Sequence, residues 1–240
     1  MTEPVVFLPA MMCDARLFQA QITPLSRQRP VMVAPISGAE RVDEIATTLL
    51  DMLPHKFALA GHSMGGIVAL ELLRRAPNRV TRLALMATSP LGETPQASAA
   101  YEPLIVAARA GRLDQALEGV VPRAALAPGP GRAGVLAQFH DMAHDAGAGQ
   151  FVAQLRALQR RRDQQGTLRR CKVPTTIICG AHDTLTPPRR HALMAGLVPC
   201  ARLEVIEQAG HFMPLEAPQA LTEILQNWLA QPYVLQDRRA

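Results

Sequence analysis

The sequence predicts an α/β fold, with a mostly parallel sheet of about six strands, helices on both faces and an all-helical insertion. Short apolar runs typical of buried strands alternate with helical patterns over residues 4–89, and the alternation resumes after residue 171. Such alternation indicates βαβ units, whose crossover helices cover both faces of a parallel sheet. Over residues 90–166 no convincing strand pattern occurs, and several helical segments rich in Ala, Leu and Arg follow one another.

Four strands are expected before the insertion, as apolar runs at residues 5–8, 31–34, 57–60 and 80–86. The helices between them are expected at residues 14–26, 45–53 and 67–76, because apolar side chains there recur every three or four residues. Prolines mark two of the boundaries, since Pro30 introduces the second strand and Pro54 ends the second helix.

The insertion and the part after it complete the expected order. Helices of the insertion are expected at residues 97–110, 113–120, 132–146 and 151–161, with Pro- and Gly-containing breaks between them. Afterwards come strands at residues 175–179 and 201–206 and helices at residues 187–197 and 218–229. We therefore expect a core domain of residues 1–89 and 167–240 and a helical cap of residues 90–166.

Composition and charge exclude several classes of protein. Of the 240 residues, 48% are apolar and 19% are charged, which is ordinary for a globular chain and excludes general disorder. The formal net charge is +5, and the arginine run at residues 160–162 is interpreted as a solvated helical face. No aromatic residue interleaves with these arginines and no nucleic-acid motif accompanies them, so no nucleic-acid partner is expected.

The cysteines and the first residues bear on cofactors and location. The four cysteines, at positions 13, 171, 179 and 200, show no C-x-x-C or Cys/His ligand spacing, so neither zinc nor a disulfide framework is expected. The N-terminal residues lack a signal-peptide pattern, and no run of 18 apolar residues occurs. We therefore expect a cytoplasmic protein with no membrane partner, no metal and no cofactor.

The stretch Gly61-His62-Ser63-Met64-Gly65 lies between an expected strand and an expected helix. In that context G-x-S-x-G is typical of a nucleophile elbow, a sharp turn that exposes the serine hydroxyl. His62 is expected to point away from Ser63 and to support the turn. The alternative is a glycine-rich turn in which the serine merely caps the helix.

Two further polar residues follow their own strands. A serine hydroxyl is a poor nucleophile unless a base lies within hydrogen-bond reach and a carboxylate orients that base. Asp183 follows the strand at residues 175–179, and His211 follows the strand at residues 201–206. Because the carboxyl ends of parallel strands meet at one edge of the sheet, Ser63, Asp183 and His211 are predicted to meet there. Each residue alone could be structural, as a turn residue, a helix cap or a loop histidine.

Together these motifs resemble the α/β-hydrolase superfamily, in particular its small capped esterases, lactonases and carbon–carbon hydrolases. The likeness covers about residues 5–229 and rests on the Ser63 stretch, on Gly180 with Asp183 and Pro187, and on Gly210-His211 followed by Glu216 and Pro218. It implies an α/β-hydrolase fold in which Ser63 is the nucleophile, His211 the general base and then acid, and Asp183 the orienting carboxylate. Because the sequence reaches the loop after its first strand by residue 9, the family's first two strands are not expected in it.

The resemblance also implies an oxyanion hole formed by the backbone N–H groups of Met11 and Met64. Members of the family usually carry His-Gly where this chain has Pro9-Ala10. Pro9 has no N–H, but the donor is the residue that follows Ala10. The Cβ of Ala10 leaves the path of this loop open. Met12 is expected beside the two donors, on the apolar floor of a substrate pocket.

The expected function is hydrolysis of a small carboxylic ester or lactone through an acyl-enzyme on Ser63. Carbon–carbon bond hydrolysis and thioester hydrolysis use the same triad, and a non-catalytic small-molecule receptor on the same fold is the alternative from another class. A carboxylate-bearing substrate also stays open, because the insertion carries Arg109, Arg156 and Arg160. The partner is expected to be a small ester-like molecule, and the chain a monomer or homodimer.

Overall fold

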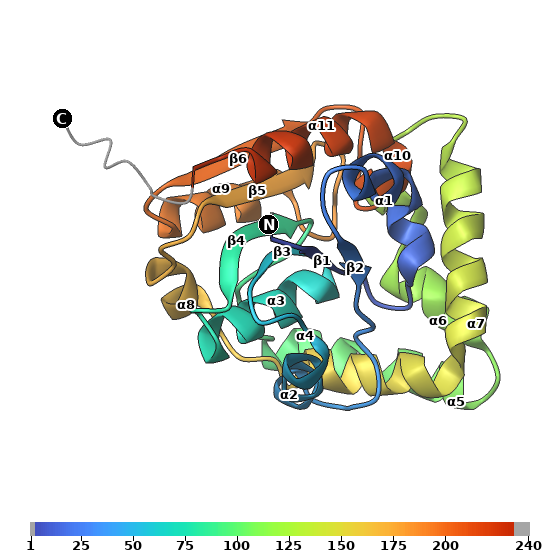
Figure 1. Ribbon diagram of the computed structural model, residues 1–240. Coiled ribbons are helices and arrows are strands. Elements are labelled where there is room, and N and C mark those ends of the chain that lie inside the picture. The colour runs from blue at the N-terminus through green and yellow to red at the C-terminus, as the bar shows by residue number, and fades with distance from the viewer. Residues whose placement is uncertain (1–2, 233–240) are drawn as a thin grey trace.

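The computed structural model describes residues 3–232, which form a six-stranded sheet in the order β2-β1-β3-β4-β5-β6 (Figure 1). All neighbouring strands are parallel, which confirms the predicted fold class. The chain steps outward from β1 to β2, returns past β1 to β3 and then runs on to β6. The strand order therefore reverses beside β1 and β3, where α/β proteins bind their ligands. The strands are β1 (Val5–Leu8), β2 (Val31–Val33), β3 (Phe57–His62), β4 (Val80–Met86), β5 (Thr175–Gly180) and β6 (Ala201–Ile206).

Helices cover both faces of this sheet (Figure 1). On one face α1 packs against α10 and α11, and α11 also contacts β4 and β6. On the other face α3 lies against β1 and β3 with α2 and α8 beside it, and α9 covers β5 and β6. These elements are a 3-10 turn (Ala15–Phe18), α1 (Gln19–Ser26), α2 (Val42–Met52), α3 (Met64–Arg75), α8 (Gln165–Arg169), α9 (Pro188–Leu197), α10 (Met213–Glu216) and α11 (Pro218–Leu229).

The insertion between β4 and β5 is helical, as predicted. It holds α4 (Pro95–Ala100), α5 (Glu102–Arg109), α6 (Leu113–Val120), a 3-10 turn (Arg123–Ala125) and α7 (Arg132–Gln159). Gly147 interrupts α7 with φ 80° and ψ 165°, and Figure 1 shows the two halves of this helix meeting at a sharp bend. Glycine tolerates this positive φ without the clash that a Cβ would cause. The bend coincides with the break that the sequence predicts at residues 147–149.

Other boundaries differ from the sequence-based expectation. The helix expected at residues 97–110 is split at Tyr101 into α4 and α5, and Pro103, which has no N–H to donate, stands at the start of α5. The strand β3 extends to His62 and α3 begins at Met64, so the turn between them is the single residue Ser63. The sequence did not predict α8 or α10, which are four or five residues long.

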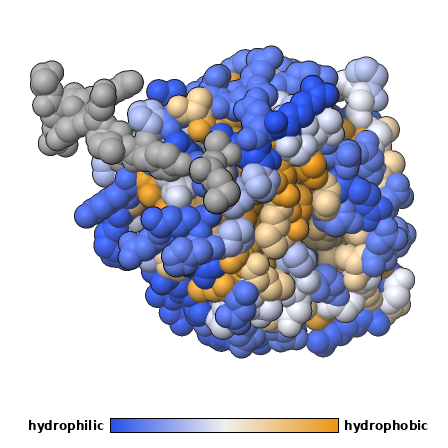
Figure 2. All heavy atoms as spheres, in the orientation of Figure 1, coloured by the Kyte–Doolittle hydropathy of each residue, from blue (hydrophilic) through white to orange (hydrophobic). Residues whose placement is uncertain are grey.

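The apolar side chains gather in one continuous core on both sides of the sheet. The first ten residues of α3, from Met64 to Leu73, are all buried, so this helix lies inside the fold. In the view of Figure 2 hydrophilic residues surround a central band of apolar ones. No helix of the described part of the chain is both long enough and apolar enough to cross a bilayer.

The substitution Gly65→Ala is expected to destabilise the fold by at least about 3 kcal/mol, because it overpacks backbone against backbone. A Cβ at Gly65 would lie 2.2 Å from the carbonyl oxygen of Leu8 at the end of β1. Urea unfolding followed by circular dichroism measures this loss. Gly134→Ala is the matched control, because its Cβ meets nothing within 4 Å and alanine favours a helix by about 0.5–1 kcal/mol. Equal stability of Gly65→Ala and the wild-type protein would contradict the expected clash.

Candidate active site

Ser63 occupies the turn between β3 and α3 in a backbone conformation that few residues adopt, with φ 52° and ψ −116°. Strain of this kind persists only where surrounding contacts hold it. Here the Ser63 N–H donates to the Met86 carbonyl at 2.8 Å, and the Thr88 hydroxyl donates to the Ser63 carbonyl at 2.7 Å. A Cβ at Gly61 would lie 2.5 Å from the Gly65 carbonyl oxygen, so the tight turn also depends on glycine there.

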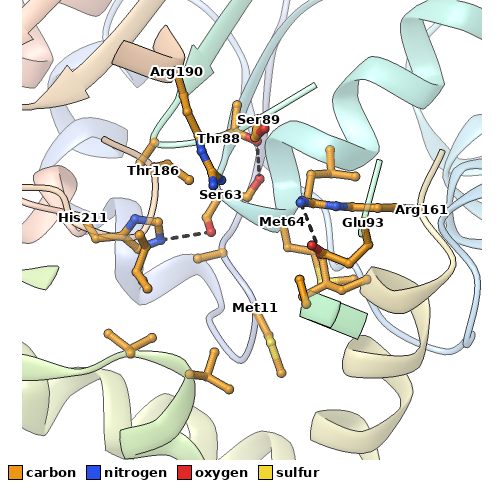
Figure 3. A pocket seen from close by; sticks show the side chains of 18 of the residues that line it. Met11, Ser63, Met64, Thr88, Ser89, Glu93, Arg161, Thr186, Arg190 and His211 are labelled. Atoms are coloured by element: carbon orange, nitrogen blue, oxygen red, sulfur yellow. Dashed lines mark hydrogen bonds and ion pairs between the residues drawn. The ribbon is translucent and has the colours of Figure 1, made fainter. Parts of the chain in front are cut away.

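The three polar residues that the sequence places after separate strands form one hydrogen-bonded chain. Ser63 Oγ lies 3.0 Å from His211 Nε2, and His211 Nδ1 lies 2.9 Å from Asp183 Oδ2. His211 and Asp183 are buried, whereas Ser63 is partly exposed and faces a cavity (Figure 3). In this geometry His211 can accept the hydroxyl proton at Nε2 while its Nδ1–H is held by a carboxylate.

Asp183 stays ionised in spite of its burial. Desolvation raises the pKa of this carboxyl, but the charge of His211 and hydrogen bonds from His211 and Thr186 lower it to about 2 overall. Asp183 Oδ1 accepts the N–H groups of Leu185 and Thr186 at 2.9 Å each, and Oδ2 accepts the Thr186 hydroxyl at 2.6 Å. The carboxylate is therefore fixed in position as well as charged, which suits it to orient the imidazole.

Groups from three other segments hold the backbone around His211. Glu216, in α10, accepts the N–H groups of Gly210 and Phe212 from this loop, at 2.9 and 2.7 Å, and that of Ala127, at 2.7 Å, from the insertion. The His211 N–H donates to the Ala125 carbonyl at 2.8 Å. His62 Nε2 lies 2.7 Å from the His211 carbonyl. Glu216 belongs to the motif that resembles the family, but its role as an acceptor for these three N–H groups was not predicted from the sequence.

His62 is neutral, and it lies beneath His211 rather than beside the Ser63 hydroxyl. Burial and then the charge of His211 lower the pKa of His62 to about 3. A neutral ring that donates from Nε2 to the His211 carbonyl leaves Nδ1 as an acceptor, and within the described residues no donor reaches it. His62 also stacks on the Phe212 ring at 5.9 Å. It therefore supports the loop of His211, consistent with the supporting role expected from the sequence.

Met11 and Met64, whose backbone N–H groups the sequence marks as candidate donors, lie at the cavity beside Ser63. Met11 and Met64 both line the cavity, and as the first residue of α3 Met64 has no acceptor for its N–H inside the helix. No hydrogen bond of the described residues uses the Met11 N–H. Ala10, which replaces the glycine expected at this position, is buried and fits without displacing the loop from the cavity.

The position of Met12 differs from the one expected. Its backbone takes a positive φ of 58°, and its side chain lines a second cavity with Ile36 and Gln154 instead of the cavity at Ser63. The Met12 N–H donates to Gln154 Oε1 at 2.9 Å, and Gln154 Nε2 donates to the Ile36 carbonyl at 3.0 Å. Gln154 belongs to the second half of α7, so the insertion holds the loop that carries Met11.

The cavity beside Ser63 has a volume of about 330 Å³ and contains both core and insertion residues. Most of its wall is aliphatic or aromatic, with side chains such as Ile67, Val121 and Leu158. Its charged residues are Glu93, Arg161 and Arg190. Glu93 pairs with Arg161 at 3.2 Å and accepts the Tyr101 hydroxyl at 3.2 Å (Figure 3). Burial and the charge of Glu93 raise the pKa of Tyr101 to about 12, so this hydroxyl stays protonated.

The arginines singled out from the sequence do not line this cavity. Arg156 pairs with Glu102, and Arg160 lies 3.3 Å from a Glu40 carboxylate oxygen. Arg109 ends α5 outside the cavity lining. These three side chains therefore give no support to the carboxylate-bearing substrate that the sequence left open.

Among the described residues, one set of side chains could hold a metal ion. Asp114 of α6 and His140 and His144 of α7 place one ligand atom each within 4.8 Å of one another. His144 Nε2 lies 2.7 Å from Asp114 Oδ1. None of the three residues lines the cavity at Ser63, so they take no part in the hydrogen-bonded chain described above.

Comparison with known proteins adds to this geometry. A family model described as alpha/beta hydrolase fold matches residues 38–218. A pimeloyl-(acyl-carrier protein) methyl ester esterase from Aromatoleum aromaticum is 30% identical over 196 residues, which cover 75% of this chain and 76% of that protein. The chain spans less than two thirds of several other curated relatives that it matches, at 15% to 58% of their length.

Two solved structures share the fold over almost the whole chain. A thermophilic esterase from Thermogutta terrifontis aligns with a TM-score of 0.85 at 24% identity, covering 95% of this chain and 89% of that one. The enol-lactonase from Burkholderia xenovorans LB400 aligns with a TM-score of 0.85 at 21% identity, covering 96% and 92%. At these identities the likeness is one of fold.

Two buried histidines make stability depend on pH. Burial lowers the pKa of His62 to about 3 and that of His191 to about 4. Between these values and about 6.5 the unfolded chain binds more protons than the folded one, so stability is full above pH 6.5 and falls as the pH drops. At pH 5 we expect a loss of about 2 kcal/mol for each histidine, measured by urea unfolding.

Substitutions separate this effect from general acid denaturation. His191→Gln is expected to lower stability at pH 7.5 and to remove about half of the fall between pH 7.5 and pH 5. His55→Gln changes an exposed histidine and is expected to leave the fall unchanged. A wild-type protein equally stable at pH 7.5 and pH 5 would show that these histidines are not buried as neutral groups.

Proposed function

The chain belongs to the α/β-hydrolase family, and from this membership we propose that it cleaves a small carboxylic ester or lactone through an acyl-enzyme on Ser63. That it is a hydrolase acting on esters follows from the family and from its esterase relative. The observation that carries the finer proposal is the continuous hydrogen-bonded chain from Ser63 through His211 to Asp183. Its serine end opens into an apolar cavity large enough for a small ester.

The first half of the proposed reaction forms the acyl-enzyme. Ser63 Oγ attacks the substrate carbonyl carbon while its proton moves to His211 Nε2, and Asp183 stabilises the imidazolium that results. The carbonyl oxygen becomes an oxyanion between the N–H groups of Met11 and Met64. Each such donor contributes about 10²–10³ to the rate in related acyl-transfer sites. The C–O bond to the leaving group then breaks, and His211 donates its proton to the departing alcohol.

The second half consumes one water molecule. His211 takes a proton from water, and the resulting hydroxide attacks the acyl carbon through a second oxyanion at the same donors. Collapse breaks the bond to Ser63 Oγ, which recovers its proton from His211. The sum is ester plus water giving acid plus alcohol, and for a lactone both products are one hydroxy acid.

The insertion acts in this proposal as a cap that selects the substrate. It supplies cavity residues from α4, from the C-terminal half of α6 and from the end of α7, among them Ala97, Val120 and Leu158. A mostly apolar wall favours a short acyl chain and limits the access of bulk water during the reaction. The division into a core of residues 1–89 and 167–240 and a cap of residues 90–166 belongs to this proposal, as do a cytoplasmic location and a monomer or homodimer.

Three other functions fit the same site. Carbon–carbon bond hydrolysis and thioester hydrolysis need the same serine and base, so the substrate distinguishes them from ester hydrolysis. A small-molecule receptor on this fold would bind in the same cavity without turnover. The fixed carboxylate and the hydrogen bond between Ser63 and His211 favour turnover over simple binding.

The substitution Ser63→Ala tests the nucleophile. We expect a loss of at least about 10⁴ in kcat on p-nitrophenyl esters of increasing chain length, on a lactone and on an acyl thioester. A fluorophosphonate probe should label the folded wild-type protein at Ser63, with mass spectrometry as the readout. Full turnover by the variant, or no labelling of Ser63, would overturn the acyl-enzyme proposal.

The substitution Glu216→Gln tests how far reactivity depends on the position of His211. An amide cannot accept from three N–H groups as the carboxylate does, so kcat is expected to fall about 10- to 100-fold with little change in KM. Glu223→Gln alters an exposed glutamate on α11 and serves as control. If the melting temperature of Glu216→Gln fell while kcat stayed at the wild-type value, the glutamate would be structural only.

A further inference from the structure

Arg190 is a cation placed inside the wall of the reactive cavity. It belongs to α9, which begins at Pro188, and it lines the same cavity as Ser63. Figure 3 shows its side chain extending into the cavity toward Ser63, on the side of the cavity that carries Thr186. Arg190 is half-buried.

The other charges of the cavity leave Arg190 without a partner. Glu93, the acidic side chain of the lining, is paired with Arg161 at 3.2 Å, and both residues are partly buried. Tyr101, which donates to Glu93, is a neutral phenol. In the described part of the chain no hydrogen bond or ion pair reaches the Arg190 guanidinium. Glu93 and Arg161 neutralise each other, and Arg190 is left as a cation of the lining with no partner in contact among the described residues.

This charge decides which substrates the cavity tolerates. In the open cavity water hydrates the guanidinium, but a bound ester displaces that water. A wholly apolar substrate would remove the water that hydrogen-bonds the guanidinium and offer no acceptor in its place. The loss of these hydrogen bonds makes the free energy of binding less favourable. A carboxylate replaces the lost water with two parallel charge-assisted hydrogen bonds, because its geometry matches the planar guanidinium.

We propose that the cavity takes esters or lactones that carry a carboxylate, and that Arg190 binds this group while Ser63 attacks the ester carbonyl. The inference rests on the proposed function and names its substrate class. A single guanidinium matches one negative charge, which favours a carboxylate over a phosphate dianion. The volume of about 330 Å³ limits the substrate to a short chain between the two groups. Arg190 is thus a specificity-determining residue.

Matched pairs of esters test the proposal. On the acyl side, monomethyl glutarate is compared with neutral methyl hexanoate, and on the alcohol side 4-acetoxybutanoate is compared with pentyl acetate. The wild-type protein is expected to prefer the charged member of one pair. Arg190→Gln should lower kcat/KM for that member about 10- to 100-fold and raise it for the neutral ester, because the neutral ester no longer has to strip water from a cation.

The neighbouring arginine provides a control of equal charge. Arg189→Gln removes an exposed cation from the same turn of α9, outside this cavity, and is expected to change neither ester by more than about 2-fold. If Arg189→Gln and Arg190→Gln changed kcat/KM for the charged ester to a similar extent, the preference would come from the net electrostatic field of the protein and not from a contact with Arg190. Equal losses on charged and neutral esters in Arg190→Gln, or no preference for either charged ester in the wild type, would overturn the proposal.

Binding measured without turnover keeps the two proposals distinguishable. In Ser63→Ala, calorimetry should detect the preferred charged ester, and the added substitution Arg190→Gln should weaken its binding about 10-fold or more. If the protein hydrolyses no ester but binding of the charged ester still depends on Arg190, the carboxylate site stands and the acyl-enzyme proposal fails. If the protein hydrolyses neutral esters and binding of the charged ester does not depend on Arg190, the acyl-enzyme proposal stands and the carboxylate site fails.

Discussion

The close approach of α3 to the end of β1 is the contact on which the rest of the site depends. At Gly65 the helix passes so near to the backbone of Leu8 and Pro9 that no side chain fits between them. This contact places the first turn of α3 beside the loop after β1, at the point where the strand order reverses. Ser63, at the start of α3, and Met11, on the loop after β1, line the same cavity as a result.

A second layer of polar contacts turns this frame into a fixed arrangement. The loop of His211 has its N–H and carbonyl groups bound by Ala125, His62 and Glu216, which come from the insertion, from β3 and from α10. Asp183 is held in the same way by the backbone that follows it. Buried polar groups satisfied to this degree restrict movement, so the imidazole meets the serine hydroxyl without reorganisation.

The sequence predicted what depends on local pattern. Alternating strands and helices indicated the parallel sheet, and the positions of Ser63, Asp183 and His211 directly after their strands were enough to place them together. It did not predict contacts between segments far apart in the chain, such as Gln154 with Met12 or Glu93 with Arg161. Met12 was misplaced because a positive φ turns its side chain toward a different cavity. Which arginines face the cavity was likewise decided by tertiary packing, which the local sequence pattern does not show.

The bend of α7 at Gly147 has a mechanical consequence. It directs the second half of the helix back along the core, where Gln154 bridges the loop of Met11 and Met12 to the segment after β2. The second half of α7, which covers the cavity, is therefore connected through Gln154 to the loop of Met11 and Met12. If this half of the helix lifted away from the core, it would break the hydrogen bonds of Gln154 and release the loop that carries Met11 and Met12. Movement of this half of α7 and movement of that loop are therefore coupled.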